Sequence, residues 1–198
     1  MIIGFIAGLV AENAGEWVAH RYLLHEQGMK KGSFWSFHFH EHHRASRLSE
    51  FRDPHYERPL FSGLHAQSKE ALALAAVALP FIPLLRVAPG LSLGVLTGIA
   101  NYYRVHKKSH QDPEWAKHHL PWHYDHHMGP NQHANWCVTW PLFDHVMGTR
   151  EYYLGTEREK KDRARREEIA QKRAQRAAEA AQSARAGEPD LTKTPTTA

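Results

Sequence analysis

The sequence predicts an all-α, integral-membrane helical protein with a histidine-rich site for two metal ions and a charged C-terminal helical tail. Three observations support this prediction. The chain has 17 histidines in 198 residues, and most of them fall into four short groups. Three apolar segments, each long enough for a helix, occur among these groups. After Gly155, the composition changes abruptly to charged residues and alanine.

The first apolar segment covers residues 2–19 and begins directly after Met1. It has no basic stretch before it and no small-residue cleavage site, so we expect a membrane helix rather than a cleaved signal peptide. Glu12, Glu16 and His20 are four residues apart and share one helical face. Carboxylates are costly inside a membrane and usually face a functional interior, so we expect Glu16 to orient the His20 imidazole.

The second and third apolar segments cover residues 71–88 and 91–105, with a turn signal at Pro89-Gly90 between them. Both segments are shorter than the roughly 20 residues that a straight membrane-spanning helix needs. Pro80 and Pro83 therefore favour a kinked or re-entrant hairpin. Buried helices of a soluble domain are the alternative interpretation.

The order of these segments predicts a multi-pass topology with every histidine group on the same side of the membrane. If the first segment runs inward, the second runs outward and the third returns to the side reached by the first. Basic residues concentrate on that side, which the positive-inside rule assigns to the cytoplasm (the inner membrane in a bacterium). They comprise the residues of the tail together with Lys30, Lys31, Arg44, Arg47, Arg52 and Arg58.

The second histidine group, His38 to His43, has the spacing H-x3-HH with an additional His40 inside it. On an α-helix, His38 and His42 share a face and His43 points at least a quarter-turn away. Adjacent imidazoles in this group would then serve different ions. We favour His38, His42 and His43 as ligands, and a set that uses His40 with His43 is the alternative.

The other three groups are H-x4-H at the end of the first segment, H-x3-H at the end of the third, and H-x2-HH after Pro121, which is well placed to start a short helix. Ten imidazoles exceed the three protein ligands of a typical catalytic zinc site and suit two ions with about five ligands each. A single cysteine, Cys137, excludes cysteine-rich zinc and iron–sulfur sites. The predicted metal ligands are His20, His25, His38, His42, His43, His106, His110, His123, His126 and His127.

The tail begins at residue 156. Residues 156–187 are rich in Glu, Lys, Arg, Ala and Gln without a large apolar stripe, which predicts a solvated helix. Residues 188–198 have the composition of a disordered segment. No base-reading motif is visible, so we expect no nucleic-acid partner.

The four histidine groups, together with Glu16-Trp17 before the first and the ending Asn135-Trp136 … Phe143-Asp144 … Gly148-Thr149, resemble the fatty acid hydroxylase/sterol desaturase superfamily over residues 12–150. The resemblance implies that residues 1–155 form a membrane-embedded fatty acid hydroxylase-like catalytic domain with its dimetal site on the cytosolic face. The chain departs from the family pattern in its additional His40 and in having fewer apolar spans than the four typical of lipid-hydroxylating members.

The same resemblance implies the cofactor, the reaction and the partners. The cofactor is two iron ions, which zinc is able to replace, and no catalytic residue is expected beyond the metal ligands. The reaction is O2-dependent hydroxylation of a fatty acyl, sterol or carotenoid-like lipid, with desaturation as the alternative. The chain lacks flavin, nicotinamide and iron–sulfur motifs, so a separate reductase, ferredoxin or cytochrome would supply the electrons.

Two other functions compete with this interpretation. A non-enzymatic membrane metal-binding or transport protein would need histidines spread along a path through the bilayer, whereas here they gather at one surface. Haem binding between two histidines of the apolar helices is the third interpretation.

Overall fold

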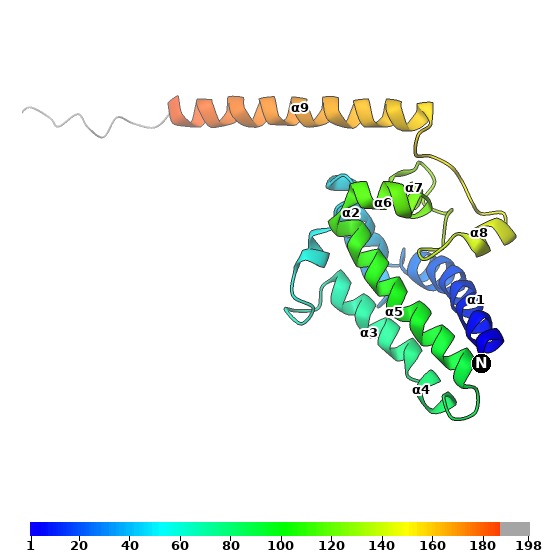
Figure 1. The fold of residues 1–198 in the computed structure, drawn as a ribbon. Helices are drawn as coiled ribbons and strands as arrows, with labels where there is room; N and C mark the ends of the chain where they lie inside the picture. Colours follow the sequence, from blue (N-terminus) through cyan, green and yellow to red (C-terminus); the bar gives the residue numbers. More distant parts are fainter. Residues whose placement is uncertain (187–198) are drawn as a thin grey trace, which may run out of the picture. The chain divides into compact units, whose positions relative to one another are not determined.

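The computed structural model describes residues 1–186, and every regular element in this range is a helix (Figure 1). The chain divides into two units, Met1–Leu154 and Gly155–Ala198. In the second unit, α9 (Glu157–Ala186) is the expected charged helix, with ion pairs such as Lys160–Glu157 and Lys172–Glu168 along its surface. The predicted disordered segment 188–198 lies outside the described residues.

The first apolar segment forms α1 (Ile2–Val18), which continues directly into the π-helix η1 (Ala19–Gln27). Within residues 1–186, the combined stretch Ile2–Gln27 is the one helix that is long and apolar enough to cross a membrane. The second segment is broken, as expected, into α3 (Ala66–Ala78) and α4 (Phe81–Leu84), because Pro80 lacks the N–H that a continuous helix requires. The third segment forms α5 (Pro89–Gln111).

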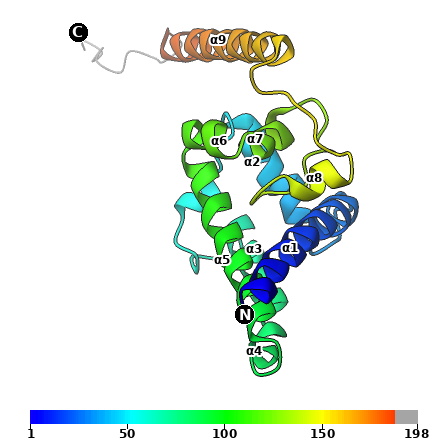
Figure 2. The same cartoon turned by 45° about the vertical axis from the view of Figure 1, so that its right-hand side comes forward.

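Glycines hold α1 and α5 in close contact. A Cβ atom on Gly8 would lie 2.3 Å from the Leu91 carbonyl oxygen, and one on Gly94 would lie 2.2 Å from the Phe5 carbonyl oxygen. Small residues four apart allow two helix backbones to approach in this way. Gly4 faces Gly90 and Gly8 faces Gly94, so the two helices run parallel (Figure 2).

The parallel arrangement brings the ends of η1 and α5 to the same end of the first unit, where the remaining short helices gather (Figure 1). Of the twelve largest fully buried side chains in the described chain, nine are histidines. The interior at this end of the unit is therefore rich in imidazoles, which lie beside buried apolar side chains such as Phe51, Tyr124 and Met128. The short helices are η2 (Phe37–His43), α2 (Arg44–Leu48), η3 (Pro54–Glu57), α6 (Pro113–His119), α7 (Pro121–Met128) and α8 (Leu142–Val146).

We predict that Gly94→Ala lowers the free energy of unfolding by about 1–3 kcal/mol, because the new methyl group forces α1 and α5 apart. Thermal unfolding in detergent measures this change. Gly15→Ala on α1 is the matched control, since a Cβ there meets no atom within 4 Å. Equal stability of Gly94→Ala and the unaltered protein would contradict the glycine contact.

Candidate metal centre

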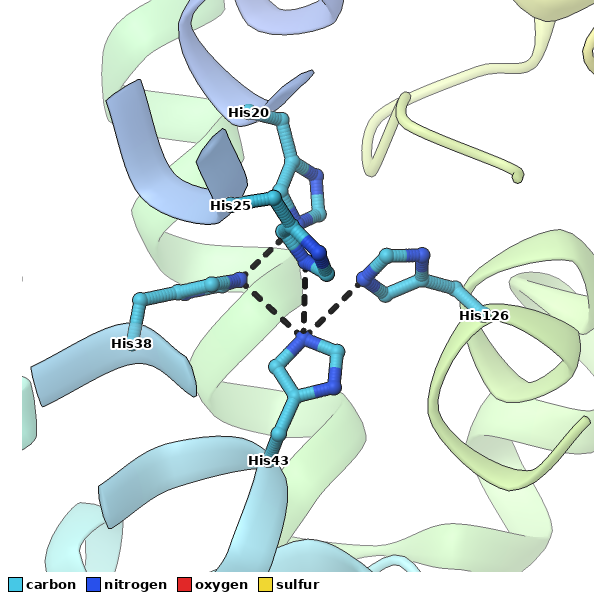
Figure 3. A group of neighbouring side chains, drawn as sticks. All are labelled: His20, His25, His38, His43 and His126. Carbon is cyan, nitrogen blue, oxygen red and sulfur yellow. Dashed lines mark hydrogen bonds between the residues drawn. The ribbon is translucent and has the colours of Figure 1, made fainter. Parts of the chain in front are cut away.

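The structure gathers the ten predicted histidines into one buried region at the shared end of η1 and α5. Two sets have ring nitrogens that lie within 4.8 Å of one another. We call them cluster 1 and cluster 2. Cluster 1 contains His20, His25, His38, His43 and His126 (Figure 3), and cluster 2 contains His42, His106, His110 and His127. The tenth residue, His123, adjoins cluster 2, with its Nε2 atom 3.0 Å from His110 Nε2.

The π-helical form of η1 and η2 explains which histidines meet. In an α-helix, residues five apart point about 140° away from each other. The i→i+5 bonding of a π-helix brings them to one face. His20 and His25 in η1 therefore share cluster 1, and so do His38 and His43 in η2. His42 belongs to cluster 2 although its ring lies near that of His38, with centroids 5.2 Å apart, so the two groups divide between His42 and its neighbours His38 and His43.

The spacing of the Nε2 atoms in cluster 1 suits a shared ion. His38 Nε2 lies 2.9 Å from His20 Nε2 and 3.1 Å from His43 Nε2, and His126 Nε2 lies 3.1 Å from His43 Nε2 (Figure 3). Imidazole nitrogens bind transition metals such as zinc at about 2.1 Å, so two ligands at right angles are separated by about 3 Å. The observed distances match that separation.

Backbone carbonyls orient two of the cluster 1 rings. The Nδ1–H of His20 donates to the Trp136 carbonyl at 2.5 Å, and the Nδ1–H of His126 donates to the Ala134 carbonyl at 2.7 Å. A carbonyl oxygen only accepts hydrogen bonds, so in each neutral ring the proton resides on Nδ1. The lone pair is consequently on Nε2, which points into the cluster and is the nitrogen available to a metal.

In cluster 2, buried carboxylates orient two of the rings. His42 Nδ1 donates to Asp53 and His106 Nδ1 donates to Glu70, both at 2.6 Å. The Nε2 atoms of His42 and His106, and both ring nitrogens of His127, are buried without a hydrogen-bond partner among the described residues. A buried polar atom without a partner costs about 1–3 kcal/mol, and a bound cation would remove this cost.

Burial also keeps these rings neutral. It lowers the pKa of His38, His43 and His127 well below the usual range, and it lowers the pKa of His126 to about 3. A histidine must be deprotonated at one nitrogen before it binds a metal. The imidazoles of His38, His43, His126 and His127 are therefore neutral at neutral pH, which is the form that binds a metal.

The loop after α7 holds its carbonyl groups in place through Asp144. This buried carboxylate accepts hydrogen bonds from the backbone N–H of Trp136 at 2.7 Å and of Cys137 at 2.9 Å. Between the two carbonyls that orient histidines, Asn135 has a positive φ of 58°. Asparagine tolerates this conformation better than most residues, so Asn135 allows the Ala134 and Trp136 carbonyls to face cluster 1.

Positive φ angles of 51° and 76° also occur at Glu50 and Phe51. The Phe51 carbonyl accepts a hydrogen bond from His110 Nδ1 at 2.8 Å, and its ring stacks on the His110 ring with centroids 4.5 Å apart. Strained backbone of this kind is retained where surrounding contacts overdetermine it, commonly at functional sites.

The sequence did not reveal the partners of the histidines. The expectation that Glu16 orients His20 is wrong, because Glu16 accepts hydrogen bonds from the backbone of Val138 and Thr139 at 3.0 and 3.2 Å, while Trp136 holds His20. His40 contributes to neither cluster, and its Nε2 bonds to the Met29 carbonyl at 3.0 Å. The one signal in the sequence for Asp53 was its position shortly after a histidine group. For Glu70 it was the position of a carboxyl group just before an apolar segment.

An apolar cavity of about 270 Å³ leads away from cluster 1 between α1, α3 and α5. His20 and His38 line one part of it, and Glu12, Glu16 and Glu70 supply its carboxyl groups. Most of its wall is aliphatic or aromatic, with residues that include Leu23, Ala73, Leu74, Val77, Val95 and Ile99. The cavity therefore suits an apolar molecule.

We predict that Asp53→Ala lowers metal affinity about 10–100-fold, because His42 loses the acceptor that fixes its ring and its tautomer. Titration of the metal-free protein with Fe²⁺ or Zn²⁺ measures the change. Asp53→Asn keeps an acceptor oxygen, so its loss should be smaller, and Asp162→Ala in α9 should have no effect. Unchanged affinity in Asp53→Ala would contradict this role.

Comparison with known proteins gives one family. The family model described as "Fatty acid hydroxylase" matches residues 5–149. Searches of curated proteins and of solved structures give no match. The family match confirms the resemblance found in the histidine groups and in the ending around Asp144. The chain belongs to the fatty acid hydroxylase family, within the fatty acid hydroxylase/sterol desaturase superfamily.

Proposed function

We propose that this protein is an O2-dependent di-iron hydroxylase of a lipid substrate. The observation that carries the proposal is the pair of buried imidazole clusters beside an apolar cavity. Membership of the fatty acid hydroxylase family supports it further.

The ten histidines fit two metal ions. Cluster 1 would bind one ion through five imidazoles, and cluster 2 together with His123 would bind the other through five more. Iron bound there would supply the activation of O2, and zinc would also bind, because imidazole ligands accept both metals. Outer acceptors such as Asp53 and the Trp136 carbonyl keep the rings that they contact in the orientation and tautomer that ligation requires.

The apolar cavity would hold the part of the lipid that reacts. His20 and His38 belong to cluster 1 and also line the cavity, so a C–H bond in this part of the cavity lies next to the metal site. Burial of the clusters excludes bulk water from the reaction. The balanced reaction is RH + O2 + 2H⁺ + 2e⁻ → ROH + H2O, and a separate protein would supply its electrons.

We further propose a multi-pass arrangement in the membrane, with the clusters on the cytoplasmic side. Apolar side chains are exposed on α1, on α3 and α4 with the turns that follow them, and on the first part of α5. These stretches precede the histidines of η1 and of α5. Large exposed apolar surfaces are typical of contact with a membrane or a partner. These side chains are Ile2, Ile3, Ile6, Leu72, Val77, Leu79, Ile82, Leu84, Val87 and Leu93.

Replacing single histidines tests the ligand set. We predict that His110→Ala or His127→Ala abolishes activity and lowers metal content, because each removes an imidazole from cluster 2. Elemental analysis and product assays measure both effects. His40→Ala is the matched control, since His40 lies outside the clusters, and it should retain its metal. Full metal content and activity in His127→Ala would exclude His127 as a ligand.

Narrowing the cavity tests the substrate site. We predict that Ala73→Phe reduces kcat/KM at least about tenfold without loss of metal, because the larger ring occupies space that the lipid needs. Ala76→Phe on the same helix is the matched control, because Ala76 is exposed and does not line the cavity. Equal effects of the two substitutions would place the substrate elsewhere.

The experiment that tests the proposed function is turnover under ¹⁸O2 in membranes that contain the iron-loaded protein, a chemical reductant and a lipid extract. Hydroxylation predicts a lipid product that carries one ¹⁸O atom and is absent with His127→Ala. Products that carry no ¹⁸O atom and have an added double bond would indicate desaturation instead. Absence of any oxidised lipid, with both irons bound and reduced, would contradict the proposal.

A further inference from the structure

A depression of about 540 Å³ with basic side chains in its lining lies on the surface of the first unit next to cluster 1. Its wall is formed by the turn after η1, by η2 and α2, and by Gln132 of the loop after α7. The lining contains three cationic side chains and no carboxylate. The lining residues are Lys31, Ser36, Phe39, His40, His43, Arg44, Arg47 and Gln132.

His43 connects this depression to both clusters. Its Nε2 belongs to cluster 1, while its Nδ1 lies 3.1 Å from the Gln132 side-chain oxygen in the wall of the depression. The His43 ring also stacks on His127 of cluster 2, with centroids 4.1 Å apart and an interplanar angle of 29°. Phe39 of the depression also stacks on His43, with centroids 5.8 Å apart. A molecule in the depression is thus separated from the clusters by one imidazole ring.

The cationic residues of the depression have different roles. Arg47 is part of the site's architecture, because its guanidinium donates to the carbonyls of His127 and Gly129 at 2.6 and 2.9 Å. Lys31 and Arg44 are exposed. Exposed charges at the rim of an interface mainly accelerate association and select a partner of opposite charge. Lys31 and Arg44 therefore make the depression attractive to an acidic surface.

We infer that this depression is the docking surface for an acidic one-electron carrier protein, and that electrons enter the metal centre through His43. The inference rests on the proposed function, which consumes two electrons per turnover, so two carriers are oxidised for each lipid hydroxylated. His43 belongs to cluster 1 and also lines the depression, so it offers a short route for electrons from the surface to the metals. This position favours an electron carrier over other acidic proteins. A small, charge-steered contact suits a carrier that must leave after each transfer.

The test measures binding of an acidic [2Fe–2S] ferredoxin to the full chain in uncharged detergent, with the metal-free and the iron-loaded protein. The charge-reversal variant is Lys31→Glu/Arg44→Glu. The control is Arg104→Glu/Arg173→Glu, which changes the net charge equally at two exposed positions outside the depression. We expect the first variant to raise Kd at least about tenfold at low salt and to flatten its salt dependence, while the control binds normally.

Reduction of the bound iron provides the second measurement. Reduced ferredoxin should transfer electrons to the charge-reversal variant at least about tenfold more slowly than to the control, whereas dithionite should reduce both proteins at one rate. Unchanged ferredoxin binding in Lys31→Glu/Arg44→Glu would overturn the inference. The inference would also be overturned if Lys31→Glu/Arg44→Glu lost affinity only for vesicles that contain phosphatidylglycerol. The depression would then bind lipid headgroups.

These measurements distinguish a failure of the docking surface from a failure of the proposed function. If the protein binds iron and forms hydroxylated lipid with a chemical reductant, but ferredoxin binding ignores the depression, then only the docking surface is wrong. If the protein binds no iron, the proposed function fails, and the binding measurement on metal-free protein still tests the docking surface by itself.

Discussion

Ten imidazoles in one buried region are stable together only if their ring nitrogens have partners, and this requirement organises the first unit. The outer Nδ1 atoms of six rings bond to oxygen acceptors of the protein, as in the pairs His42–Asp53 and His20–Trp136. The inner Nε2 atoms then face one another with lone pairs rather than protons. Such an arrangement is repulsive without a cation and favourable with one. The strained backbone at Phe51 and Asn135 is one cost of supplying those acceptors.

The packing of the long helices also brings the histidines and their acceptors together. The glycine contact between α1 and α5 makes the two helices parallel, so His20 and His106 arrive at one end of the unit. The antiparallel return through α3 brings Glu70 within hydrogen-bonding distance of His106. The same three helices enclose the apolar cavity beside cluster 1. One packing arrangement thus positions the buried histidines, their hydrogen-bond acceptors and the apolar cavity.

The histidine groups and the helical class were predictable from the sequence, because ligand spacing and apolar runs are local properties. The broken second segment followed from Pro80, and the start of α7 followed from Pro121. The pairing of His38 with His43 was not predictable from α-helical periodicity, because η2 is a π-helix. The acceptors were also hidden, since Trp136 and Ala134 act through backbone carbonyls that any residue possesses. Asp53 and Glu70 lie 11 and 36 residues from the histidines that they orient.

The proposed function requires that the two imidazole clusters hold two iron ions in each chain. The most direct test is elemental analysis combined with Mössbauer and X-ray absorption spectroscopy on iron-loaded protein in mild detergent. We expect two irons per chain, each surrounded mainly by imidazole nitrogens at about 2.1 Å. One iron per chain, or a first shell dominated by carboxylate oxygens, would contradict the proposed function.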